Sequence, residues 1–167
     1  MCIRDSNDIV SKIYHFRVEG KDYLVYADRY RLYILDRKGK ERVKVSTLLN
    51  LSANTSLYLT KQNGQMKMAF MDANGAIVLV NFRGQVERIK GEEMIGGGMF
   101  NVEDVNNDGQ DEFIYTLKNR IVVMDNKGKL LFEKHWEDSE LDFPYIYRFS
   151  ARDSRIGIMD GKGERLF

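Results

Sequence analysis

The residues best suited to chemistry in this sequence lie in one acidic stretch, residues 104–112. Oxygen-bearing side chains occupy its first, third, fifth and ninth positions: Asp104, Asn106, Asp108 and Glu112. Hard cations such as Ca²⁺ take roughly six to eight oxygen ligands, and alternate residues of a tight loop can point their oxygens inward. We therefore expect these four side chains and the backbone carbonyl of Gln110 to bind one structural Ca²⁺. Gly109 should provide the sharp turn, and Asp111 should face solvent.

The same stretch also resembles two other kinds of loop, an EF-hand and an Asx-rich turn. An EF-hand needs a bidentate Glu at the twelfth position and a helix on each side, but Tyr115 occupies that position inside an apolar strand pattern. The EF-hand is therefore excluded. An Asx-rich turn without a metal stays open as the alternative, because Asp and Asn side chains also stabilise loops through hydrogen bonds to the backbone. Catalysis is not expected here, since no base or nucleophile accompanies the loop.

The composition argues against several classes of function. The 26 Lys and Arg residues are balanced by 25 Asp and Glu, which gives no argument for binding to nucleic acid. Cys2 is the only cysteine, so neither a disulfide framework nor a thiolate metal cluster is expected. His15 and His135 stand far apart and read as ordinary strand residues. No apolar run approaches the roughly 18 residues of a transmembrane helix.

A repeat of about 44 residues positions the acidic loop. Its motif, an apolar pair followed by Asp or Asn, basic residues and Gly, occurs at residues 33–39, 79–84 and 123–128. The turn glycines Gly39, Gly84 and Gly128 are separated by 45 and 44 residues, the length of one four-stranded propeller blade. The sequence therefore predicts an all-β fold, a β-propeller segment of about three and a half four-stranded antiparallel blades.

Apolar alternation and turn residues predict where the strands lie. The predicted strands are 13–18, 23–27, 31–35 and 41–45 in the first blade, 66–71 and 76–80 in the second, and 112–117 and 120–124 in the third. Asn74-Gly75 and residues 118–119 predict tight hairpins. The blades are expected at approximately 12–47, 56–90, 99–135 and 145–167, with loops between them and no helix. Their middle strands should be apolar on both faces, so burial between blades should be the main stabilising term.

Both ends of the chain depart from the repeat. Residues 1–6, Met-Cys-Ile-Arg-Asp-Ser, fit no strand pattern and resemble translated adaptor sequence at the starts of proteins from metagenomic assemblies. We expect them to be a non-native leader. The last blade stops within its third strand, and propellers need roughly four to eight blades to close. We therefore expect a piece of a longer protein.

The acidic loop resembles the calcium loop of FG-GAP and VCBS-type propeller repeats, which lies between the first two strands of a blade. It departs from that motif at Glu112, where Asp is usual, and at Asn107, where Gly is usual. The whole chain is similar to uncharacterised bacterial propeller proteins of the quinoprotein-like or WD40-like kind. That resemblance implies a non-enzymatic binding or scaffold module for a protein or glycan partner. It also favours the cell envelope, where millimolar Ca²⁺ would fill a modest site.

Two other functions remain open from the sequence. Propellers also house quinone-dependent dehydrogenases and polysaccharide-degrading enzymes, which would need carboxylates, a Lys-Arg pair or His residues on the inner strands. Those strands offer mainly Tyr14, His15, Tyr58, Asn101, Tyr147 and Arg148. The other possibility is an assembly factor whose open sheet edges capture peptide strands.

Overall fold

The computed structural model describes residues 8–53, 55–89, 99–117, 119–136, 141, 144–150, 153–160 and 163–166. The first sheet holds β1 (Tyr14–Val18), β2 (Lys21–Ala27), β3 (Leu32–Leu35) and β4 (Glu41–Val43), and the second holds β5 (Tyr58–Gln62), β6 (Gln65–Met71), β7 (Ile77–Asn81) and β8 (Val86–Ile89). The third holds β9 (Phe100–Glu103), β10 (Glu112–Leu117), β11 (Arg120–Met124) and β12 (Leu130–His135), and the fourth holds β13 (Tyr145–Ser150), β14 (Asp153–Asp160) and β15 (Gly163–Leu166). No helix occurs among these residues.

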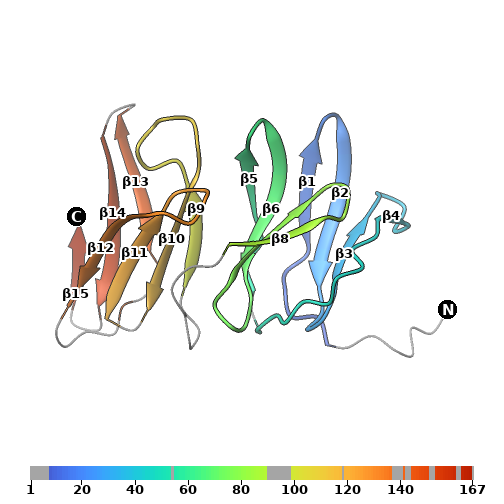
Figure 1. Cartoon of the computed structure of the whole chain (residues 1–167), viewed down its shortest axis with the longest axis horizontal. Coiled ribbons are helices and arrows are strands. Elements are labelled where there is room, and N and C mark those ends of the chain that lie inside the picture. The colour runs from blue at the N-terminus through green and yellow to red at the C-terminus, as the bar shows by residue number, and fades with distance from the viewer. Residues whose placement is uncertain are drawn as a thin grey trace.

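Each sheet is a simple antiparallel meander, and the four sheets lie in chain order along the longest axis of the molecule (Figure 1). The all-β prediction is therefore confirmed, as is the pairing of consecutive strands within each sheet. The strands expected at 112–117 and 120–124 have the predicted bounds, and the other predicted strands differ by no more than two residues at either end. The predicted leader, residues 1–6, and residue 118 of a predicted hairpin lie outside the described residues.

One side-chain pattern builds four of the hairpins. Asp36 Oδ1 accepts hydrogen bonds from the backbone N–H groups of Lys38 and Lys40, at 2.8 and 3.0 Å. The same bonds to the second and fourth residues onward are made by Asp72, Asn81 and Asp125. Three residues after each of these four stands a glycine with positive φ, between +76° and +86°. The three-residue spacing between Asp or Asn and Gly in the sequence therefore reflects the backbone of the turn. The third residue must adopt positive φ, which glycine does without steric cost.

The hairpin expected at Asn74-Gly75 is present but longer than a two-residue turn. Residues 72–76 connect β6 to β7, and Asp72 closes the loop by accepting from the N–H groups of Asn74 and Ala76. The Asx pattern therefore prevails over the two-residue turn that Asn-Gly favours.

The core consists of three apolar clusters, each between successive sheets. Val25 and Ile34 of the first sheet pack with Met68 and Phe70 of the second, and all four are buried. The second cluster joins the second and third sheets, and includes Ala69, Leu79, Phe113 and Tyr115. The third joins the third and fourth sheets, and includes Ile114, Ile121 and Ile158. Alternate residues of a middle strand thus face opposite neighbours, as the sequence predicted.

Tyr26, in the first sheet, lies outside these three apolar clusters. It stacks on Tyr33 with ring centroids 4.8 Å apart, on the face of the first sheet opposite to the one that packs on the second. Both tyrosines are only half-buried.

In the part of the chain that the structure covers, no helix is long and apolar enough to cross a membrane.

Candidate metal-binding loop

The connection between β9 and β10 is much longer than its counterparts. It spans eight residues, 104–111, whereas β1 and β2 are joined by Glu19 and Gly20, and β5 and β6 by Asn63 and Gly64. The backbone of the long connection turns back at two residues with positive φ, Asn107 at +58° and Gly109 at +83°. The sharp turn expected at Gly109 is therefore present, within a loop that has room for an ion-binding arrangement.

Three predicted ligands fold back over this loop. The Asp104 carboxylate accepts from the N–H groups of Asp108 and Gly109, both at 3.1 Å. Asn106 Oδ1 accepts from Asp108 N at 2.8 Å, and Asp108 Oδ1 accepts from Gln110 N at 2.8 Å. These are the bonds of an Asx-rich turn, and they fix each of the three side chains to the backbone of its own loop.

The fourth predicted ligand joins the same group. Asn106 Nδ2 donates to Asp108 Oδ2 at 3.2 Å and to Glu112 Oε1 at 3.1 Å. The other oxygen of Glu112 accepts from Val105 N at 2.9 Å. The four side chains predicted as ligands are therefore joined by hydrogen bonds within one loop. Gln110, of which only the backbone carbonyl is a predicted ligand, turns its side chain to the β11–β12 hairpin, where its Oε1 accepts from Asn126 Nδ2 at 3.1 Å.

Glu112 is the buried carboxylate of this loop. It is only 2% exposed, and this burial raises the pKa of its carboxyl group. The N–H of Val105 lowers that pKa, while the charge of nearby Asp108 raises it again. Among the described residues, no Lys or Arg forms an ion pair with the side chains of Asp104, Asp108 or Glu112. A buried carboxylate beside two others is an arrangement that a divalent cation would neutralise.

The donor set fits Ca²⁺ better than a transition metal. All of the side-chain atoms that could bind a metal ion are oxygens, from three carboxylates and one amide, whereas zinc sites are usually built from Cys and His. No three His, Cys, Asp or Glu side chains of the described chain form a metal site by themselves. An ion would therefore also use the Asn106 oxygen and a backbone carbonyl, and the Asn106 amide would have to turn its oxygen toward the ion.

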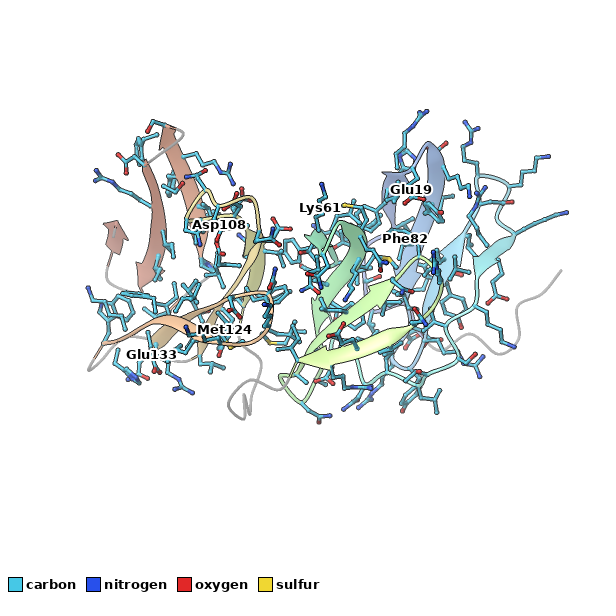
Figure 2. The ribbon with its side chains drawn as sticks, turned by 45° about the horizontal axis from the view of Figure 1, so that its top comes forward. Glu19, Lys61, Phe82, Asp108, Met124 and Glu133 are labelled. Carbon is cyan, nitrogen blue, oxygen red and sulfur yellow. The ribbon has the colours of Figure 1, made fainter. Side chains whose placement is uncertain are left out.

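Asp111, which was expected to face solvent, is partly exposed and also makes a contact that was not expected. Its Oδ2 accepts a hydrogen bond from Lys61 N of β5, on the second sheet, at 3.0 Å. Figure 2 shows Asp108 of the loop and Lys61 on neighbouring sheets, both in the upper part of the view. Sequence reasoning missed this contact because it depends on how two sheets stack. The one feature of the sequence that could have indicated this contact is the position of Lys61. It lies next to the Asn63-Gly64 turn, which is the equivalent of the acidic loop in the preceding repeat.

Two of the inner-strand residues that the enzyme alternative would use, His15 and Tyr58, have partners within the fold. His15 is 57% exposed, and its Nε2 lies 3.0 Å from Asp22 Oδ1. Tyr58 donates to the carbonyl of Phe100 at 2.7 Å, and burial raises the pKa of its hydroxyl to about 12. The His15 contact links β1 to β2, and the Tyr58 bond links the second sheet to the third.

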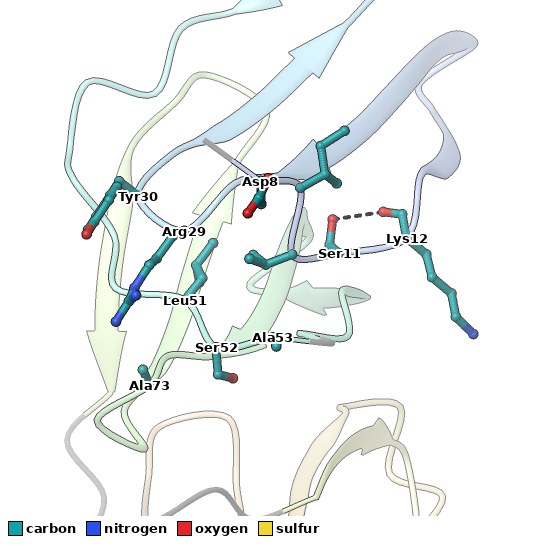
Figure 3. Close-up of a pocket in the computed structure, with 11 residues that line it drawn as sticks. Asp8, Ser11, Lys12, Arg29, Tyr30, Leu51, Ser52, Ala53 and Ala73 are labelled. Atoms are coloured by element: carbon teal, nitrogen blue, oxygen red, sulfur yellow. Dashed lines mark hydrogen bonds between the residues drawn. The ribbon is translucent and has the colours of Figure 1, made fainter. Parts of the chain in front are cut away.

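A wide groove of about 840 Å³ lies away from the acidic loop, where the N-terminal segment crosses residues 51–53 (Figure 3). Its wall mixes Arg29, Tyr30 and Leu51 with small residues, and Ser11 Oγ donates to the Lys12 carbonyl at 2.8 Å. Its charged lining side chains are exposed. The groove therefore has no buried polar group that would select a ligand.

Comparison with known proteins gives information on the fold. No family model matches the chain, and no curated protein matches it. A solved structure of a protein of unknown function from Bacteroides caccae superposes with a TM-score of 0.52 and 13% sequence identity. The match covers 95% of this chain and 59% of that one, so this chain spans about three fifths of that protein's length. At this identity the likeness shows a shared arrangement of antiparallel sheets.

Proposed function

We propose that this chain is a segment of a β-propeller that serves as a non-catalytic binding or scaffold module, with one structural Ca²⁺ in the loop of residues 104–112. The observation that carries the calcium site is the buried Glu112, which is linked through Asn106 to Asp108 without a compensating Lys or Arg in the described chain. The propeller proposal is supported by consecutive four-stranded meanders that pack face to face through apolar clusters.

The ion would be held by the side chains of Asp104, Asn106, Asp108 and Glu112 with a carbonyl from Gln110. When bound it supplies positive charge to a loop that otherwise holds several carboxylates together. The chain's own residues then keep the loop folded between β9 and β10, so the role is structural. We also propose an exported or envelope protein, because millimolar Ca²⁺ outside the cytoplasm would fill a site of modest affinity.

The binding role rests on the architecture. Apolar side chains of the middle strands are used between sheets, which leaves strand-connecting loops and the sheet edges as the surfaces for a protein or glycan partner. Of the inner-strand residues, Tyr58 donates to the carbonyl of Phe100 on the third sheet, and His15 Nε2 lies 3.0 Å from Asp22 Oδ1.

Calorimetric titration tests the calcium site. The wild-type chain should bind one Ca²⁺, and Asp108→Ala should weaken binding by at least about tenfold, since it removes a charged ligand. Asp36→Ala is the control, because Asp36 Oδ1, like Asp108 Oδ1, accepts from the N–H group two residues onward, but in a hairpin of the first sheet. It should bind Ca²⁺ as the wild type does. Equal heats from wild type and Asp108→Ala would reject the site.

A further inference from the structure

The first and fourth sheets, at opposite ends of the array, each have one face outside the apolar clusters (Figure 1). The other face of each end sheet packs on its neighbour, in the first and third clusters respectively. We call the uncovered face of the first sheet the head face, and it carries Leu24, Tyr26, Tyr33 and Leu35. We call the uncovered face of the fourth sheet the tail face, and it carries Tyr145, Tyr147 and Phe149.

The head face holds positions that are covered in the next two sheets. Leu35 directly precedes the Asx residue of its hairpin, as Val80 and Met124 do in the second and third sheets. Val80 and Met124 are only 0% and 3% exposed, because each packs on the preceding sheet, whereas Leu35 is half-buried. The same difference separates the residues two positions earlier, which are Tyr33, Val78 and Val122. The head face is therefore built like a surface that receives a preceding sheet.

The tail face holds side chains that elsewhere pack on a following sheet. The sequence Ile-Tyr-His-Phe, which runs into β1, recurs as Ile-Tyr-Arg-Phe within β13. In β1, Tyr14 and Phe16 stack with ring centroids 5.7 Å apart and pack into the cluster shared with the second sheet. In β13, Tyr147 and Phe149 are 46% and 60% exposed. Ile146 packs toward the third sheet, so the side chains on either side of it in the strand point the other way.

Each of these two faces also carries one ion pair. Arg37 Nε lies 3.3 Å from Asp22 Oδ2 on the head face, and Arg155 Nε lies 3.5 Å from Asp153 Oδ1 on the tail face. The Arg155 guanidinium also lies over the Phe149 ring, 5.2 Å from its centroid. Since each face holds a cation beside an anion, the faces can meet with each guanidinium opposite the carboxylate of the other face.

We propose that the head face of one copy of this chain docks on the tail face of a second copy. The occupant is a second copy because one chain carries both halves of this interface, at opposite ends of the array. The contact repeats the packing of successive sheets inside the chain. It uses different surfaces on the two copies, so the array either closes into a ring or continues as a filament. The association does not require the calcium site.

Sedimentation velocity over a series of protein concentrations tests this association. The wild type should form larger species as its concentration rises. Tyr26→Arg puts a charge on the head face and Tyr147→Arg puts one on the tail face, and each should raise the dissociation constant by at least about tenfold. Leu131→Arg is the matched control, because Leu131 of β12 is 47% exposed but lies on neither face. It should associate as the wild type does.

A mixture of the two blocking variants tests the head-to-tail arrangement. Tyr26→Arg keeps an intact tail face, and Tyr147→Arg keeps an intact head face. Their equimolar mixture should form a one-to-one complex with a dissociation constant at least about tenfold lower than that of either variant alone. If one of the two variants associates alone as strongly as the wild type, like faces meet and the head-to-tail contact is wrong.

Hydroxyl-radical footprinting of the wild type needs no variant, so it decides the question where a variant folds poorly. Labelling of Tyr26, Tyr147 and Phe149 should fall together as the concentration rises, while labelling of Leu131 stays constant. Protection of one face alone would overturn the head-to-tail contact. A wild-type chain that stays monomeric over the whole series would overturn the association and assign both faces to solvent or to a different partner. Neither outcome would affect the proposed calcium site, which the titration with Ca²⁺ tests separately.

Discussion

The contact between the β7–β8 hairpin and the first sheet can be tested at one glycine. Gly84 has φ +84°, and a Cβ built there would overlap the carbonyl oxygen of Lys44 and lie 3.1 Å from its carbon and 3.4 Å from Val43 Cγ1. Lys44 directly follows β4, so the hairpin tip of the second sheet lies against the backbone of the first. Gly39, at the same place in the preceding repeat, has φ +76° and no atom within 4 Å of such a Cβ.

The comparison of Gly84→Ala with Gly39→Ala isolates this contact. Both variants place alanine at positive φ, which costs about 1 kcal/mol, and both gain the same unfolded-state entropy. Only Gly84→Ala also forces backbone apart, as overpacking does, at about 2 kcal/mol. For a chain of this length that difference lowers the midpoint of thermal unfolding by about 4–8 °C more than Gly39→Ala does. Circular dichroism and urea titration would measure it. Equal losses from the two variants would refute the packing of this hairpin on the first sheet.

Three further predictions concern the core and its ionisable groups. Phe113→Ala should destabilise by about 3–5 kcal/mol in urea, because Phe113 is fully buried between sheets, whereas Phe149→Ala, at a side chain 60% exposed, should change little. The raised pKa of Glu112 means that ionisation of its carboxyl group opposes folding, so the metal-free protein should lose stability as pH rises from about 4 through that pKa. Thermal unfolding of Glu112→Gln in EDTA should not show this loss of stability. If the variant and the wild type depend on pH in the same way, the prediction is wrong. In Tyr58→Phe, the tyrosine that ionises near pH 12 should disappear from an ultraviolet titration, and loss of its bond to Phe100 should cost about 1 kcal/mol.

The local parts of this structure could be predicted from the sequence. The spacing of Asp36 and Gly39 recurs because one side chain and one left-handed glycine close each turn within five residues. Apolar runs 112–117 and 120–124 gave correct strand bounds because both faces of these strands are buried. In the acidic loop, the inward gathering of four side chains follows from the same local rule.

What could not be predicted depends on contacts far apart in the chain. Asp111 was expected in solvent, yet it bonds to Lys61, 50 residues earlier. No pattern within the loop indicates this, because it arises only when the second and third sheets stack with β5 near β9. Arg148 and Asp104 are likewise joined across 44 residues, one repeat length. The repeat indicated that such neighbours exist but not which side chains meet.

The self-closed turns also bear on how the chain is built during synthesis. Asp36, Asp72, Asn81 and Asp125 each secure a hairpin with groups no more than four residues away. A meander can therefore begin to form as it leaves the ribosome, before the next one has been translated. The apolar face of that sheet stays exposed until the next sheet has been translated and packs on it. A pause in translation between repeats therefore lengthens the time in which chaperones or other nascent chains can bind this face.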